Sequence, residues 1–302
     1  MKVDTRSHWR RFCCSLGSCA RVSFLPIKEL VMYCGRTGLG LACALLLSGA
    51  TVGMAVASAE EMKFPLRAQY ETVGVKPIST ADLLAHFNNY TIIDARSEYE
   101  YQTLHIEGAE SVPLSSPGFD QSVKALADKT KKPLVFYCNG TTCEKSYKAA
   151  VRAIQSGVKQ VLVYDAGIFH WAEANPGKTD LLGKKMQSAG QLISKADFAA
   201  HLLSPRDFYE RVMGDPNAIV LDIRDAGQRA GVSLFQMRDV HVPLDNARLA
   251  DWVSRAKQEN RAMFFIDATG HQVQWLQYYL KEQGLHNYWF MKGGAKAFFD
   301  TL

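Results

Sequence analysis

The sequence has few cysteines outside its first 59 residues. Five of the seven lie at or before position 43, and only Cys138 and Cys143 lie beyond residue 59. One pair five residues apart is too little for a disulfide framework in a chain of this size. Because 47% of the residues are hydrophobic, an ordinary core can form without such bonds. We therefore interpret the pair as a chemical site.

The chain also has no surplus of basic charge after residue 59. Seven of the 35 basic and two of the 30 acidic residues lie in 1–59, so 28 of each kind remain after it. Nucleic-acid binding needs a surplus of Lys and Arg facing phosphates, so we expect no nucleic-acid partner. The 22 glycines and 10 prolines are unexceptional in number, so we expect no long low-complexity linker.

Residues 1–59 are typical of an export leader. A basic flank, an apolar stretch and a small-residue A-x-A site ending at Ala59 predict a secretory signal peptide. Cleavage after Ala59 would start a periplasmic or secreted protein at Glu60. The alternative is a membrane anchor, which is less favoured because Gly, Ser and Thr dilute the apolar stretch. A start at Met32 would give a more compact signal.

The remainder of the chain contains two copies of one pattern, offset by about 128 residues. A short apolar run ending in Asp-x-Arg occurs at 90–96 and again at 218–224. A buried-strand pattern that breaks into a polar loop occurs at 132–138 and again at 261–267. Each copy is therefore expected to be one structural unit.

The same offset relates the later elements. We expect helices at 145–155 and 272–282, and a strand with a glycine turn at 160–167 and 287–294. Strands that alternate with helices predict a parallel sheet covered on both faces. The fold class is thus α/β, with two three-layer α/β/α domains.

The expected domains are 60–183 and 184–302, and the polar stretch 175–190 joins them. Serines 79 and 194 are each followed three residues later by Asp. Both are expected to cap helices, at 83–87 and 198–203.

Five segments of the first unit resemble the rhodanese (sulfurtransferase) family. In chain order they are Asp94-Ala95-Arg96, His105-Ile106-Glu107-Gly108-Ala109, Val112-Pro113-Leu114, Phe136-Tyr137-Cys138 and 166–171. The resemblance implies a tandem rhodanese in which Cys138 of the first domain is the catalytic residue. The second domain resembles the family less closely, because Asp267 occupies the cysteine position, and it is expected to be degenerate.

The loop after Cys138 indicates an anion site. Backbone N–H groups of a curled loop and the start of the next helix would stabilise a thiolate and a persulfide on Cys138. Lys145 would add a cation at the loop mouth, and Asp94 and Arg96 are expected to pair and support the loop. The candidate loop residues are Asn139, Gly140, Thr141, Thr142, Cys143, Glu144 and Lys145.

The same residues allow other interpretations of the Cys138 loop, some open and some disfavoured. Phosphatases of the C-x5-R type need Arg to grip phosphate, whereas here six residues precede Lys145, so this class is disfavoured. Cys143 is either an incidental loop residue or a thiol that forms a disulfide with Cys138. Asp267 and His271 fall short of a ligand set, so no metal is expected, and no cofactor either.

The sequence therefore predicts a sulfurtransferase that works through a Cys138 persulfide. Sulfane sulfur would move from a small donor such as thiosulfate to a thiol or cyanide, and a protein is a possible acceptor. The alternatives are a thiol redox protein that uses a Cys138–Cys143 disulfide and a non-catalytic persulfide carrier. The sequence leaves the oligomeric state undetermined.

Overall fold

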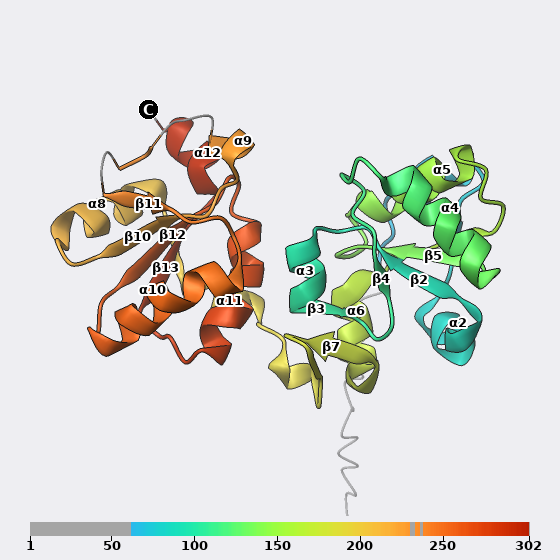
Figure 1. The fold of residues 1–302 in the computed structure, drawn as a ribbon, viewed down its shortest axis with the longest axis horizontal. Helices are drawn as coiled ribbons and strands as arrows, with labels where there is room; N and C mark the ends of the chain where they lie inside the picture. Colours follow the sequence, from blue (N-terminus) through green and yellow to red (C-terminus); the bar gives the residue numbers. More distant parts are fainter. Residues whose placement is uncertain (1–61, 230–232, 236–237, 302) are drawn as a thin grey trace, which may run out of the picture. The chain divides into compact units, whose positions relative to one another are not determined.

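The computed structural model describes residues 62–229, 233–235 and 238–301 (Figure 1). The leader therefore lies outside the described residues, and with it the predicted cleavage after Ala59 and the alternative start at Met32. Among the described helices, none is long and apolar enough to cross a membrane. The described chain contains two five-stranded sheets and one small three-stranded sheet.

The first large sheet is entirely parallel. Its central strand pairs Phe136 with Ile93 on one side and with Val163 on the other. In sheet order the strands are β1 (Lys76–Pro77), β6 (Val161–Tyr164), β5 (Leu134–Tyr137), β2 (Thr91–Asp94) and β4 (Glu110–Ser111).

The second large sheet repeats this topology, again with every pair parallel. In the corresponding order its strands are β9 (Leu202–Leu203), β13 (Tyr288–Met291), β12 (Met263–Ile266), β10 (Ile219–Asp222) and β11 (Asp239–His241). The matched strand order gives the sequence repeat a structural counterpart.

Twelve α-helices accompany the sheets in the described residues. The first six are α1 (Arg67–Glu71), α2 (Thr80–Ala85), α3 (Glu98–Thr103), α4 (Phe119–Thr130), α5 (Lys145–Gln155) and α6 (Gly167–Ala174). The other six are α7 (Lys195–Ala199), α8 (Pro205–Gly214), α9 (Ala226–Arg229), α10 (Asn246–Gln258), α11 (Gln272–Glu282) and α12 (Gly294–Phe299). Short 3-10 turns occupy Phe87–Asn89, Pro176–Lys178 and Ala189–Gln191.

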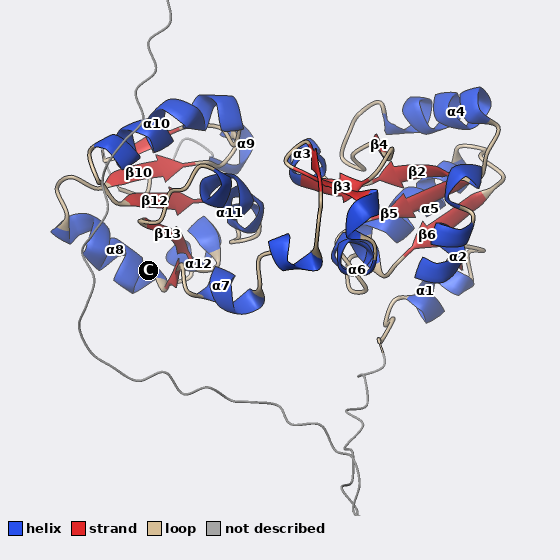
Figure 2. Ribbon diagram, turned by 90° about the horizontal axis from the view of Figure 1, so that it is seen from below, coloured by secondary structure: helices blue, strands red, loops and turns tan. Residues whose placement is uncertain are grey.

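Both faces of each large sheet are covered, as the continuous apolar strands predict. Alternate residues of β5 point to opposite faces: Phe136 packs with residues of α4 and α5, whereas Val135 packs with residues of α2 and α6. In the second sheet Phe265 faces α10 and α11, and Phe264 faces α8 and α12. Figure 2 shows helices on both sides of the strands of each sheet. The predicted α/β/α fold class is confirmed.

Two helix predictions match closely and two do not. The helices expected at 145–155 and 272–282 are α5 and α11. Ser79 and Ser194 are N-caps as predicted, but the helix after Ser194 ends at Ala199 rather than reaching 203. The helix after Ser79 ends at Ala85, followed by a 3-10 turn.

Leu202–Leu203 is a strand because it pairs with β13, so sheet formation overrides the helical pattern there. The true counterpart of Ser79 is Ser204, which caps α8 directly after β9 as Ser79 caps α2 after β1. The segment Val112-Pro113-Leu114 directly follows β4.

The segment 175–190, which is expected to join the two domains, forms secondary structure of its own. It contains β7 (Thr179–Leu181) and β8 (Lys184–Lys185), which form an antiparallel hairpin. β7 also pairs antiparallel with β3 (Leu104–Ile106), so the hairpin completes a sheet with the first half of the chain. The domain boundary at 183/184 stays a prediction, and it falls in the turn of this hairpin.

Candidate active site

Cys138 directly follows β5, the central strand of the first sheet. The carboxyl ends of parallel strands share one edge of a sheet, where open α/β folds place their ligand sites. The loop from Cys138 leads into α5, which begins at Lys145. Cys138 itself is 1% exposed, so the sulfur lies beneath the loop rather than at the surface.

The Cys138 sulfur is bonded to the sulfur of Cys143. The sequence left open whether Cys143 is an incidental loop residue or the disulfide partner of Cys138, and in the structure it is the partner. Two further groups approach the Cys138 Sγ: the Ser146 hydroxyl at 3.4 Å and the Cys143 carbonyl oxygen at 3.1 Å. Ser146, fully buried in the first turn of α5, places a hydroxyl beside this sulfur, and the sequence analysis missed it.

The expected cage of loop amides around the sulfur is not formed in this disulfide state. Within the described loop 138–146, no backbone N–H donates to the Cys138 Sγ, while the N–H of Cys143 is used in a turn to the Gly140 carbonyl.

Asp94 and Arg96 form a buried ion pair, as expected. The Arg96 guanidinium Nη2 lies 2.6 Å from Asp94 Oδ2, and both side chains are fully buried. Arg96 also donates to the Leu104 carbonyl at 2.5 Å and to Asn139 Oδ1 at 3.2 Å. The pair therefore supports the first residue of the Cys138 loop.

Glu100, on α3, connects this pair to the mouth of the loop and was not recognised in the sequence. Its Oε1 accepts a hydrogen bond from the Asn139 side-chain amide at 3.0 Å, and its Oε2 lies 3.6 Å from Lys145 Nζ. Burial acts to raise the pKa of Glu100. The charges of Arg96 and Lys145 and hydrogen bonds from Ser97 and Asn139 outweigh it, so the pKa lies below its ordinary value.

The remaining loop residues differ in their surroundings. Thr142 is exposed and Thr141 is half-buried in the turn, and neither side chain forms a hydrogen bond. Glu144 forms an ion pair with Lys148 on α5. Lys145 is the cation of the loop, with its side chain 50% exposed. The loop thus offers one accessible cation beside a buried sulfur.

A cavity of about 290 Å³ lies beside this loop. Lys145 supplies its exposed cationic group, because the Arg96 side chain is fully buried and paired with Asp94. Ser97 and Ser115 supply hydroxyls. Its lining is Ala95, Arg96, Ser97, Leu114, Ser115 and Lys145. A small anion is the kind of molecule that this combination of size and charge suits.

Gly167, at the start of α6, fits closely against the loop. Its φ is +77°, and a Cβ there would overlap the backbone of Asn139 and Gly140. The next residue, Ile168, donates its N–H to the Cys138 carbonyl at 2.9 Å. Trp171 of the same helix is fully buried and belongs to the core.

Asp267 occupies the corresponding position after β12 in the second sheet. Its carboxylate accepts hydrogen bonds from the N–H groups of Gly270 at 2.7 Å and Gln272 at 2.8 Å. Burial raises the pKa of Asp267, and these amides only partly offset that effect. The loop amides therefore point inward here, around a carboxylate.

The second half of the chain also reaches the first site. Trp275, on α11, stacks on Phe169, and the centre of its ring lies 4.9 Å from the Arg96 guanidinium carbon.

His105 lies in β3, where its Nδ1 is 2.7 Å from the Tyr101 carbonyl oxygen. Within the described residues, no three His, Cys, Asp or Glu side chains are grouped to hold a metal.

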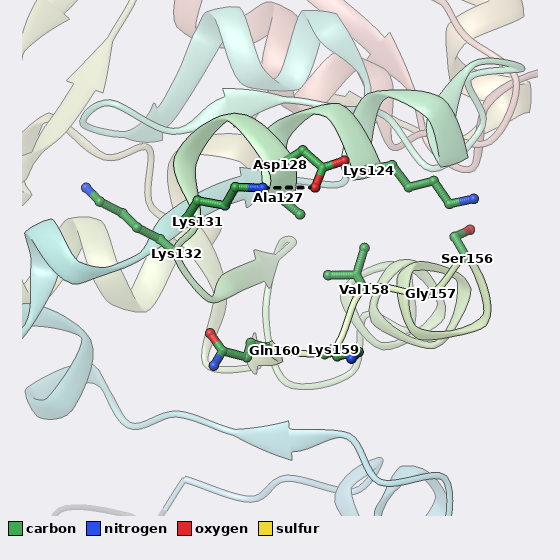
Figure 3. A pocket seen from close by; sticks show the side chains of 10 residues that line it. All are labelled: Lys124, Ala127, Asp128, Lys131, Lys132, Ser156, Gly157, Val158, Lys159 and Gln160. Atoms are coloured by element: carbon green, nitrogen blue, oxygen red, sulfur yellow. Dashed lines mark hydrogen bonds and ion pairs between the residues drawn. The ribbon is translucent and has the colours of Figure 1, made fainter.

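A larger cavity of about 460 Å³ lies away from Cys138, at the end of the sheet where β5 and β6 begin (Figure 3). Lysines 124, 131, 132 and 159 line it, and Lys131 forms an ion pair with Asp128. These lysines are solvated surface groups, and no chemistry-bearing side chain accompanies them. We assign it no part in the site.

Residues 79–174 match the family model described as Rhodanese-like domain. This range includes Asp94, Arg96, Cys138 and the loop that follows. The rhodanese-like domain thus supports the family resemblance of the first unit, and with it the general class of sulfur-transfer chemistry.

Curated relatives match part of the chain. The tRNA uridine(34) hydroxylase of Protochlamydia amoebophila is 25% identical over 114 residues, covering 36% of this chain and 35% of the relative. The tRNA uridine(34) hydroxylase of Wigglesworthia glossinidia brevipalpis is 33% identical over 89 residues, covering 28% and 27%. The chain therefore spans about a third of the length of these relatives.

Solved structures also resemble the chain. A thiosulfate sulfurtransferase from Pseudomonas aeruginosa is 18% identical with a TM-score of 0.30, and the likeness covers 78% of this chain and 47% of that one.

Proposed function

We propose that the protein is a sulfurtransferase that carries sulfane sulfur as a persulfide on Cys138. The observation that carries the proposal is the position of Cys138 after the central strand of a rhodanese-like domain, with the Ser146 hydroxyl on its sulfur. Once Cys138 is reduced and ionised, this hydroxyl, 3.4 Å from the sulfur, can donate to the thiolate, which is the reactive form of a cysteine.

The reaction begins from reduced Cys138. Its thiolate attacks the outer sulfur of a donor such as thiosulfate, the S–S bond of the donor breaks, and sulfite leaves with the bonding electrons. A thiol or cyanide then attacks the terminal sulfur of the persulfide, and the Cys138 thiolate is restored. Lys145, whose exposed side chain lines the adjacent cavity, favours an anionic donor.

The decisive variant is Cys138→Ser. A serine hydroxyl cannot hold sulfane sulfur, so transfer from thiosulfate to cyanide, measured as thiocyanate, should fall to background. The melting temperature should stay near that of the reduced wild type, because the replacement is close in size. Substantial thiocyanate formation by a folded Cys138→Ser protein would contradict the assignment.

A thiol redox function is the second candidate, and the Cys138–Cys143 disulfide supports it. Mass spectrometry separates the two. After reduction and treatment with thiosulfate, a sulfurtransferase gains one sulfur atom on Cys138, whereas a redox protein only cycles between dithiol and disulfide. Turnover with small acceptors would then separate an enzyme from a persulfide carrier that serves a partner protein.

The substrate named for the curated relatives is tRNA, but we propose a small anion for this chain. The supporting observation is the balance of 28 basic and 28 acidic residues after residue 59. We also propose that the rhodanese-like unit is one of two tandem domains, 60–183 and 184–302. The second, with Asp267 in place of cysteine, would support the first.

A further inference from the structure

Cys143 is placed to react with whatever Cys138 carries. The two Cα atoms lie 6.4 Å apart, within the range that a disulfide spans. Both residues belong to one short loop, which the turn from the Cys143 N–H to the Gly140 carbonyl holds in shape. The Cys143 sulfur therefore reaches the Cys138 sulfur while β5 and α5 stay in place.

The disulfide state cannot accept sulfur. The Cys138 Sγ is fully bonded, and the Cys143 carbonyl oxygen, 3.1 Å away, faces it where an anion would be repelled. In the second half, by contrast, the loop amides surround the carboxylate of Asp267. Acceptance of sulfur thus requires that the loop first be reduced.

We propose that Cys143 resolves the Cys138 persulfide and releases its sulfur as sulfide. This inference rests on the proposed persulfide. The Cys143 thiolate attacks the Cys138 Sγ, the Cys138–Cys143 bond forms, the bond to the terminal sulfur breaks, and that sulfur leaves as hydrosulfide. The two cysteines supply the two electrons that reduce the sulfane sulfur.

The cycle is then completed by a dithiol reductant. The first thiolate of the dithiol attacks Cys143, which is partly exposed, because Cys138 is only 1% exposed. Cys138 departs as a thiolate that the Ser146 hydroxyl stabilises. The second thiol of the reductant then displaces Cys143, which leaves an oxidised dithiol and a reduced loop. The partner is therefore a dithiol, either small or on a protein.

A single-turnover experiment tests this step. Wild type, Cys143→Ser and Cys143→Ala are reduced, freed of reductant without oxygen, and given one equivalent of thiosulfate. The wild type should release about one sulfide per chain and lose two thiols, whereas both variants should keep the sulfur on Cys138 and release at least about tenfold less sulfide. Cyanide added afterwards should recover that sulfur from the variants as thiocyanate.

Other outcomes overturn the inference. A wild type that keeps its persulfide with Cys143 still reduced, or variants that release sulfide as completely as wild type, would exclude Cys143 as the resolving thiol and leave the proposed function standing. If no protein takes up sulfur at all, the proposed function fails, and this inference fails with it.

Discussion

Glu100 links the buried Asp94–Arg96 pair to the loop that carries Cys138. One carboxylate oxygen accepts from the Asn139 amide, and the other faces the Lys145 ammonium. With its side chain 9% exposed, Glu100 is charged in the fold only because these groups compensate its burial. A single carboxylate therefore ties a structural ion pair to the chemistry of the loop.

This coupling predicts a specific pH dependence for Glu100→Gln. Because folding lowers the pKa of Glu100 from 4.5, the ionised group stabilises the fold above that pH, and this contribution is lost as pH falls through the lower folded pKa. The variant should lose about 1–3 kcal/mol of unfolding free energy at neutral pH. Denaturant titrations should show the difference from wild type shrinking between about pH 5 and pH 3. If the unfolding free energies of wild type and Glu100→Gln changed with pH in parallel, the stabilising role of ionised Glu100 would be contradicted.

At the scale of elements, the Cys138 loop depends on the start of α6 as much as on β5 and α5. Gly167 has a φ of +77° and leaves no room for a side chain against Asn139 and Gly140. The left-handed backbone conformation is already strained for residues other than glycine. The close approach of Gly167 to Asn139 and Gly140 is a second, steric reason for glycine at this position. The loop is thus clamped between two helix starts.

Gly157 provides a matched control for this clamp. It also has a positive φ, +96°, but a Cβ there would meet nothing within 4 Å. Gly157→Ala should therefore cost only the backbone strain, about 1–2 kcal/mol, with normal sulfur transfer. Gly167→Ala should cost more and reduce transfer, because the loop must move. Equal losses of stability and activity in the two variants would argue against the clamp.

Asp267 follows β12 as Cys138 follows β5, and we expect it to stabilise its loop rather than to take part in sulfur transfer. Asp267→Ala leaves the amides of Gly270 and Gln272 without their acceptor, so it should cost about 1–3 kcal/mol while transfer per folded molecule is unchanged. Because burial raises the pKa of Asp267, the ionised form is penalised in the fold. The cost of the substitution should therefore grow as pH falls from neutral toward about 4. Loss of turnover in a stable variant would instead make the second unit catalytic.

At the scale of the whole molecule, side chains of the second half contact side chains around the first site. Trp275 and Tyr278 of α11 belong to the apolar cluster that covers one face of the first sheet. Tyr99, beside Glu100, donates its hydroxyl to Asn246 at the start of α10. A second unit with Asp267 in place of cysteine can thus still support the site.

The net charge is also a property of the whole chain. Of the formal charge of +5, all is carried by residues 1–59, so cleavage after Ala59 would leave a neutral protein. If the Ala57-Ser58-Ala59 site is cleaved, N-terminal sequencing of protein from the export compartment should give Glu60 as the first residue. A chain that retains the apolar stretch in a membrane fraction would favour the anchor instead.

The local pattern by itself determined the α/β class and the helices at 145–155 and 272–282, and it is the basis for proposing Cys138 as the centre of the site. Each of these depends on residues close in sequence, through periodicity, capping and the break from strand to loop. The offset of about 128 residues in the sequence pattern added the position of Asp267, because it places Asp267 after β12 as Cys138 lies after β5.

Only the tertiary structure decided the rest, because it depends on partners far apart in the chain. Leu202 is a strand residue since Phe290 pairs with it, and β7 exists since β3 lies beside it. Likewise Glu100 joins the site only because α3 brings it to Asn139. Long-range pairing overrides local propensity where the two compete, and no spacing rule in the sequence records it.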